Sequence, residues 1–140
     1  MFVFQKRFWI CFLLLIMGCS DTGTLAPVSG VVTKDGEPLD NTMVYFMPDP
    51  EKGNDGSMSR AITDEEGRYS LIFTGDGTTP GAVIGWHCVT LEDLASENYR
   101  GAGKPPEPRV GGVYMDPSHT PLKVEVVDGE QSIDLEVVVK

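Results

Sequence analysis

The stretch from Thr63 to Leu91 constrains the fold more than any other part of the chain, because it holds two strand patterns joined by a turn-rich connection. From residue 68 to residue 73 every second side chain is a large apolar one, which predicts a strand with one buried face. Gly67 lies in the acidic turn before it, where a residue free to adopt a positive φ is favoured. Residues 83–92 form the second strand pattern.

This second pattern has one face that is more apolar than the other. The predicted inner face carries Val83, His87, Val89 and Leu91, and the predicted outer face carries Trp86, Cys88, Thr90 and Glu92. His87 is therefore expected in or beside the core, in a structural role. Cys88 is expected at the surface as an incidental thiol without a catalytic role.

Five further segments show strand patterns, separated by turns rich in Gly, Pro and Asp. They cover residues 27–33, 42–48, 60–63, 122–126 and 133–139. The last two are expected to form a hairpin around Asp128-Gly129. No window after the N-terminal segment has the 3.6-residue period of a helix, so the seven predicted strands indicate an all-β, two-sheet sandwich over residues 28–140.

Residues 1–18 have the composition of a secretory signal peptide, with Lys6 and Arg7 before an apolar run too short to span a bilayer. The run ends in Ile16-Met17-Gly18-Cys19, which resembles the lipobox of bacterial lipoproteins. The resemblance implies cleavage before Cys19, acylation of its thiol with palmitate or a similar chain, and stable attachment to a membrane. A secreted protein with a chance cysteine, and an uncleaved anchor, are the alternatives.

Residues 19–27 are expected to form the lipidated cysteine and a short polar tether that holds the domain close to the lipid surface. In lipoproteins of this kind the residue after the acylated cysteine influences sorting. Ser20 is not an acidic retention signal, so it favours the outer membrane of the cell envelope over the inner one.

The charge of the chain excludes some partners. Without Lys6 and Arg7, nine of the 11 basic residues remain against 21 acidic ones. This balance disfavours nucleic acid and electrostatic docking on anionic lipid, while cations and basic proteins stay open. If Cys11 leaves with the signal and Cys19 carries lipid, Cys88 has no partner for a disulfide.

Several motifs in the first two thirds of the chain share one resemblance. They are V-S-G-V-V-T-K-D-G-E-P-L from Val28, M-V-Y-F-M-P from Met43, A-I-T-D-E-E-G-R-Y-S-L from Ala61 and G-A-V-I-G-W-H-C-V-T-L from Gly81. Together they resemble the carboxypeptidase regulatory-like, transthyretin-like domains of bacterial lipoproteins. The resemblance covers residues 28–91 well and the C-terminal strands loosely. It implies a transthyretin-like (prealbumin-like) β-sandwich that acts as a binding or spacer module.

Enzymatic and metal-binding functions are weighed against the same residues. Sandwiches similar to the transthyretin-like fold include hydroxyisourate hydrolases, whose site contains a C-terminal Tyr-Arg-Gly-Ser. In this chain the similar Tyr99-Arg100-Gly101 lies in mid-chain, so the site is not carried over. Iron dioxygenases of a related fold use two Tyr and two His ligands, whereas this chain has only His87 and His119, far apart. The carboxylates at residues 49–55 and 64–66 are typical of turns. We therefore expect no catalysis, no metal site and no cofactor.

Residues 93–121 lack apolar periodicity, and long segments of this kind are typically functional or disordered. Tyr99, Arg100, Arg109 and Tyr114 are of residue types that recur at binding hot spots. The sequence therefore predicts a non-catalytic, membrane-anchored cell-envelope lipoprotein, an interaction or structural module that contacts an envelope protein or glycan through a sandwich edge or through this segment. Two alternatives stay open: a carbohydrate or small-ligand binder with Tyr45 and Trp86 as an aromatic platform, and a mobile cover that binds nothing.

Overall fold

Twelve strands make up most of the regular structure in the computed structural model, which describes residues 23–138. The strands are β1 (Leu25–Ala26), β2 (Val28–Lys34), β3 (Glu37–Pro38), β4 (Thr42–Pro48), β5 (Ser59–Ile62), β6 (Arg68–Ser70), β7 (Ile72–Phe73), β8 (Ala82–Val83), β9 (Gly85–Asp93), β10 (Lys123–Val126), β11 (Gln131–Ser132) and β12 (Leu135–Val137). The helical turns are η1 (Pro50–Lys52), α1 (Leu94–Glu97) and η2 (Gly112–Met115).

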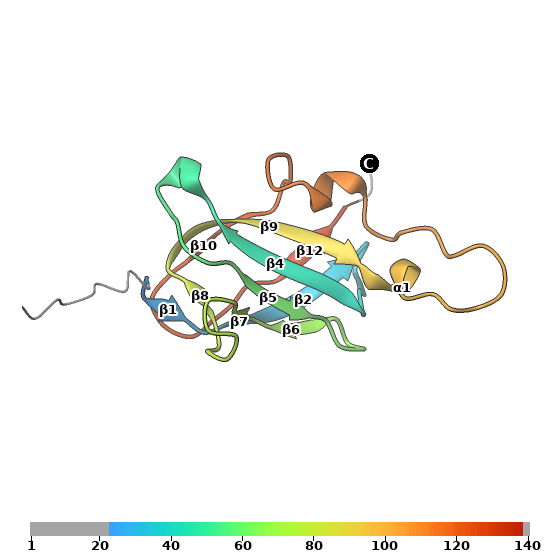
Figure 1. Ribbon diagram of the computed structural model, residues 1–140, viewed down its shortest axis with the longest axis horizontal. Helices are drawn as coiled ribbons and strands as arrows, with labels where there is room; N and C mark the ends of the chain where they lie inside the picture. Colours follow the sequence, from blue (N-terminus) through green and yellow to red (C-terminus); the bar gives the residue numbers. More distant parts are fainter. Residues whose placement is uncertain (1–22, 139–140) are drawn as a thin grey trace, which may run out of the picture.

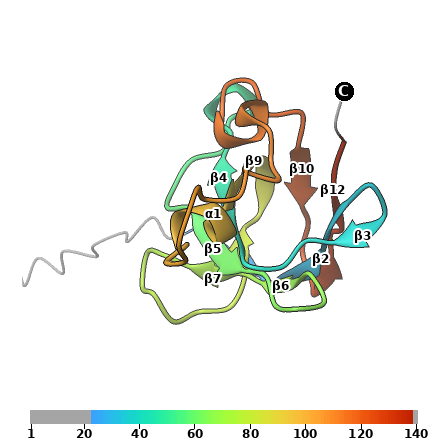
Figure 2. The same ribbon diagram turned by 90° about the vertical axis from the view of Figure 1, so that its right-hand side faces the viewer.

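The strands form two main sheets that pack around one core (Figure 1). The first sheet has the order β10-β9-β4-β5-β7. In the second, β2 is central: β11 and β12 pair with it along one side, and β3 and β6 pair with it antiparallel (Figure 2). The prediction of an all-β fold is confirmed, although the described chain has twelve strands rather than seven.

Part of this difference comes from predicted strands that are interrupted. Residues 68–73 divide at Leu71 into β6, which pairs with β2, and β7, which pairs with β5 of the other sheet. One continuous strand pattern thus crosses between the sheets and links their edges. Residues 83–92 divide in the same way at Ile84, and β8 pairs with β1 instead of extending the first sheet.

The predicted C-terminal hairpin is wrong. β10 pairs antiparallel with β9, with Lys123 opposite Cys88, whereas β12 pairs parallel with β2, with Leu135 opposite Val32. The turn near Gly129 therefore carries the chain from one sheet to the other. The free edge of β2 favours this pairing: the Ile133 amide donates to the Ser29 carbonyl at 2.8 Å there, so backbone groups that a hairpin would leave unpaired are satisfied.

The inner face predicted for residues 83–92 is confirmed. Val83, His87, Val89 and Leu91 are buried, and the His87 ring lies 5.7 Å from the Phe46 ring in the centre of the core. Nδ1 of His87 is 3.0 Å from the Gly85 carbonyl oxygen. Burial lowers the pKa of His87, so the imidazole is neutral in the folded protein near neutral pH.

Cys88 departs from its prediction, because it is buried at 6% exposure although it lies on the outer face. Lys123, opposite it on β10, covers the thiol, with Nζ 2.8 Å from Sγ. A long side chain on the neighbouring strand therefore shields a position that alternation alone places in solvent.

Two glycines are required by the fold. Gly67 has a φ of +73°, as predicted for the turn before β6. Gly30 in β2 has no room for a side chain, since a Cβ there would lie 2.0 Å from the Ile133 carbonyl oxygen and 2.9 Å from the Tyr69 ring. The Tyr69 hydroxyl donates to the same carbonyl, so β2, β6 and the segment before β12 meet at this point.

Candidate functional site: a clasped loop

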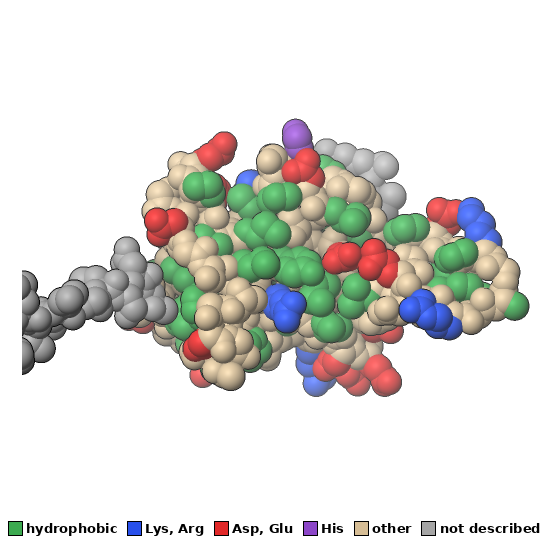
Figure 3. Space-filling view, viewed as in Figure 1, with side chains coloured by type: hydrophobic (Ala, Val, Ile, Leu, Met, Phe, Trp, Pro, Cys, Tyr) green, Lys and Arg blue, Asp and Glu red, His purple; other side chains and the backbone are tan. Residues whose placement is uncertain are grey.

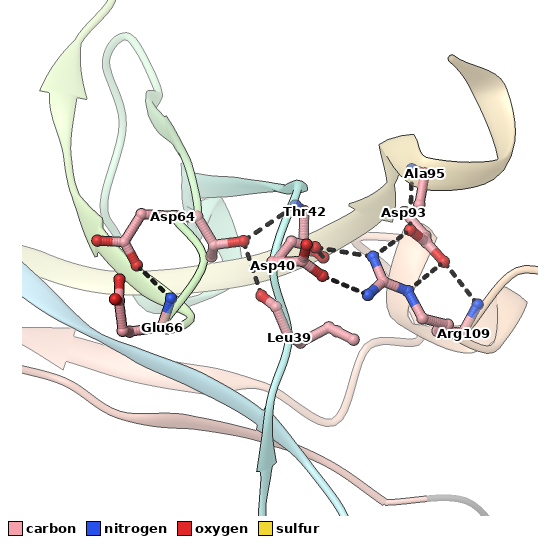
Figure 4. Close-up of polar contacts among 9 residues, drawn as sticks. Leu39, Asp40, Thr42, Asp64, Glu66, Asp93, Ala95 and Arg109 are labelled. Atoms are coloured by element: carbon pink, nitrogen blue, oxygen red, sulfur yellow. Dashed lines mark hydrogen bonds and ion pairs between the residues drawn. The ribbon is translucent and has the colours of Figure 1, made fainter. Parts of the chain in front are cut away.

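The most distinctive polar arrangement in the described chain ties together the two ends of a loop. β9 ends at Asp93, whose carboxylate caps α1 by accepting the Ala95 amide at 3.1 Å. Arg109 lies sixteen residues later and returns to the same carboxylate: its Nε donates to Oδ2 at 3.0 Å and its Nη2 to Oδ1 at 2.8 Å (Figure 4). The Arg109 amide adds a third bond, to Oδ2 at 2.7 Å. We call residues 94–108 the clasped loop.

A second anchor for the guanidinium comes from the bend before β4. Arg109 Nη1 donates to Asp40 Oδ1 at 2.6 Å, and Nη2 donates to the Asp40 carbonyl at 2.7 Å (Figure 4). Thr63 holds this bend in place, because its buried hydroxyl donates to the Leu39 carbonyl at 2.7 Å and accepts the Thr42 amide at 3.0 Å. The clasp therefore rests on the ends of three strands, β4, β5 and β9.

The electrostatics of the clasp favour the charged forms of both partners. Burial alone would raise the pKa of Asp93, whose side chain is 2% exposed, but the bonds from the Arg109 side chain and backbone outweigh it and hold this pKa below its usual value. The bonds to Asp93 likewise raise the pKa of Arg109, against the opposing effect of burial. A desolvated carboxylate matched by a two-pronged guanidinium makes a rigid base for the loop.

The start of the loop is tied to the bend before β4, where the Leu94 amide donates to the Asn41 carbonyl at 3.0 Å, and residues 100–108 beyond it are exposed and held by local contacts. The Tyr99 hydroxyl donates to the Ala102 carbonyl at 2.8 Å, with the tyrosine half-buried, and the exposed side chains of Lys104 and Glu107 pair at 2.5 Å. Arg100 is exposed, and its Nη1 reaches only the Tyr99 carbonyl, at 3.2 Å, and that of Glu97, at 3.4 Å. Of the residues predicted to bind a partner in this segment, Tyr99 and Arg100 are therefore available to one.

Arg109 and Tyr114, the other two predicted binding residues of the segment, are structural. Arg109 forms the clasp, and Tyr114 in η2 is buried, with its hydroxyl accepting the Val138 amide at 2.9 Å and donating to the Val138 carbonyl at 3.2 Å. Val110 joins the core, and Thr120 donates to the Val89 carbonyl at 2.7 Å. Residues 109–121 thus close the side of the molecule between β9 and β12 and are part of the fold.

An open cavity of about 760 Å³ lies at this closed side. Tyr114, Val113, Leu122 and Val137 give it a mainly apolar lining, and Lys34 is among its polar residues. The sequence gives no sign of this cavity, because its lining comes from β2, β12 and the irregular segment, which are far apart in the chain.

Tyr45 and Trp86 do not form the predicted aromatic platform. Tyr45 in β4 lies opposite Thr90, four residues along β9 from Trp86, and the Met47–Cys88 pair lies between them. The exposed ring of Trp86 instead has Lys52 Nζ at 5.8 Å from its centroid. The two rings therefore cannot stack on one sugar.

The carboxylates weighed as cation ligands act within their own turns. Asp49 accepts the Glu51 amide at 3.0 Å, and Asp64 accepts the amides of Glu66 and Arg68 at 3.0 and 2.9 Å. Over residues 23–138 no three His, Cys, Asp or Glu side chains converge as a metal site would require. His119 is exposed and contacts Asp116 at 2.6 Å, far in the chain from the buried His87.

Comparison with protein-family models, with curated proteins and with solved structures finds no match for this chain. Within the described residues, no helix is long and apolar enough to cross a membrane. The predicted signal peptide and Cys19 lie outside the described residues. The predicted tether, residues 19–27, ends earlier than expected, because the Thr24 carbonyl already accepts the Ile84 amide at 2.9 Å and β1 begins at Leu25.

Proposed function

We propose that this chain is a non-catalytic lipoprotein of the cell envelope, anchored to a membrane through Cys19, that contacts an envelope protein or glycan through the clasped loop. The fold that fits the proposal is a transthyretin-like β-sandwich serving as a spacer and interaction module. The single observation that carries it is the position of the two ends: β1, where the chain enters the domain, and the clasped loop lie at opposite ends of the long axis (Figure 1).

The short distance between the proposed lipid and the domain determines which end of the domain lies at the membrane. Only Ser20, Asp21 and Thr22 separate Cys19 from Gly23, so a lipid on Cys19 lies at most about 14 Å from the first described residue. The end of the domain that contains β1 and β8 then rests at the lipid surface. The clasped loop, at the other end, faces away from the membrane and towards partners.

The construction of the loop suits recognition. Its base is held by the clasp between buried Asp93 and half-buried Arg109, while Tyr99 is half-buried and Arg100 and three prolines, Pro105, Pro106 and Pro108, are exposed. Rigid ends and proline reduce the conformational entropy that a loop loses when it binds. An aromatic ring beside a guanidinium offers both apolar contact and hydrogen-bond donors.

Site-specific photo-crosslinking in intact cells tests the proposal. A photoreactive amino acid in place of Tyr99 should give discrete adducts with one envelope component, and in place of Thr78, which lies in the exposed turn before β8, it should give none of these adducts. Replacing residues 98–107 by a Gly/Ser linker of equal length should abolish binding of that component and leave the thermal transition in place, since the clasp is retained. The same adducts from both positions would contradict the proposal.

The cavity beside Tyr114 favours a second function, binding of a small ligand with an apolar body. Val113, about half exposed at its mouth, can be changed without touching the core. Val113→Arg should then abolish binding of an apolar fluorescent probe such as a naphthalene sulfonate, with no change in the thermal transition. Equal probe binding by the wild type and the variant would eliminate this function.

A further inference from the structure

Over β4, β5 and β7 the outer face of the first sheet is largely apolar, where an antiparallel sheet normally meets water with polar side chains. Along β4, Thr42, Val44 and Phe46 point into the core, so the side chains between them point outward. The apolar outer face consists of Met43, Tyr45, Met47, Ile62 and Ile72. Ile62 is 53% exposed, and hydrophobic side chains gather over the middle of this face (Figure 3). Such a face is expected to be covered by a partner.

Two opposite charges flank the row of side chains on β4. Arg60 in β5 lies opposite Tyr45, and Glu92 in β9 lies opposite Met43, on the other side of the strand. Since they are two strands apart, about 10 Å, they do not pair with each other, and no ion pair to either is present within residues 23–138. Burial and then the nearby charge of Glu97 raise the pKa of Glu92, whereas the neighbouring Tyr45 hydroxyl lowers it and no cation contributes.

We infer that this face binds a second copy of the same chain. In a two-fold dimer each contact occurs twice with the residues exchanged. Consider a two-fold axis that lies in the interface, runs roughly along β4 and passes over this strand between Met43 and Tyr45. It exchanges the β5 side of the face with the β9 side. Arg60 of each copy then meets Glu92 of the other, and the methionines, whose flexible side chains adapt to irregular contacts, pack between them. A partner without this symmetry would not need opposite charges on both sides of one apolar row.

The direction of the axis agrees with attachment of both copies to one membrane. β4 runs between the end of the molecule with β1 and the end with the clasped loop (Figure 1). A two-fold axis roughly along β4 therefore keeps both chain entries at one end of the dimer and both clasped loops at the other. The dimer surface adjoins α1 but does not include Tyr99 or Arg100, and its test measures self-association rather than capture of another component, so failure of one proposal is distinguishable from failure of the other.

A charge exchange tests this dimer. Native mass spectrometry of the purified protein in mild detergent should show a dimer for the wild type. Arg60→Glu places two acids against each other and Glu92→Arg two bases, so each should weaken the dimer by at least about tenfold. The double variant Arg60→Glu/Glu92→Arg should restore it. Arg68→Glu, exposed on β6 of the other sheet, is the matched control and should leave the dimer intact.

Circular dichroism confirms that each variant is folded. In intact cells, a photo-crosslinker in place of Met43 should give an adduct of twice the chain mass, and one in place of Ser70 on β6 should not. A wild-type monomer at the highest soluble concentration, a dimer that survives both single changes, or a double variant that stays monomeric would each overturn the inference.

Discussion

Arg109 is the residue on which the clasped loop depends most. Arg109→Met removes every bond from its side chain to Asp93 and leaves a carboxylate with 2% exposure without its counter-ion, held only by the amides of Ala95 and residue 109. We expect the free energy of unfolding to fall by about 2–4 kcal/mol in urea titrations. Arg100→Met, on an exposed arginine without a carboxylate partner in the described chain, should change it by less than about 0.5 kcal/mol. Equal effects of the two changes would show that the clasp contributes nothing.

His87 should make the stability depend on pH. Burial lowers its pKa in the folded protein from the usual 6.5, while in the unfolded chain the imidazole keeps that usual value. As the pH falls below about 6.5, the unfolded chain takes up a proton first, so stability is full above this pH and decreases towards the lower, folded pKa. Thermal transitions measured from about pH 7.5 to about pH 5.5 should fall for the wild type, and the slope should be smaller in His87→Gln. Parallel slopes would contradict this role.

Some residues could be placed correctly from the sequence and others could not. The difference is the distance along the chain to the contacts that decide whether a residue is buried. Alternation within one strand was enough to place His87, Val89 and Leu91 in the core. Cys88 was misplaced because its cover comes from Lys123, 35 residues away. Arg109 was assigned to binding because an arginine that forms a buried clasp and one at a hot spot look alike until Asp40 and Asp93 are seen beside it.

At the scale of elements, residues 109–121 connect β9 of the first sheet with β12 of the second, two strands that do not pair with each other. Tyr114→Phe removes a hydroxyl that both accepts and donates at Val138, just after β12. We expect a loss of about 1–2 kcal/mol and faster amide exchange in β12, measured by hydrogen exchange and mass spectrometry. Tyr99→Phe loses one bond in an exposed loop and serves as the control. Unchanged exchange in β12 would mean that η2 does not hold that strand.

The positions of the strands could be predicted from the sequence more easily than the pairing between them. Strand positions follow from local alternation, but the partner of a strand depends on which edge is free after the rest has folded. β12 carries apolar side chains at alternate positions that suit a hairpin with β10 equally well, and only the unpaired edge of β2 decides against it. The split of residues 68–73 between the sheets is hidden for the same reason, since both halves share one pattern.

At the scale of the whole molecule, β1 and the clasped loop lie at opposite ends of a β-sheet domain (Figure 1). The lipid anchor proposed before β1 lies outside the described residues and is a prediction from the sequence, and the direction in which the clasped loop faces depends on it. Without a lipid on Cys19, the entry at β1 would not be held at a surface, and neither end of the domain would be distinguished from the other.

Metabolic labelling with an alkyne analogue of palmitate tests this claim most directly. The wild-type chain should carry the label and migrate as the cleaved form, whereas Cys19→Ala should carry none and keep its first 18 residues. Cys88→Ser, which changes the other cysteine of the mature chain, should be labelled like the wild type. An unlabelled wild type, or a label that persists in Cys19→Ala, would contradict the membrane-anchored function.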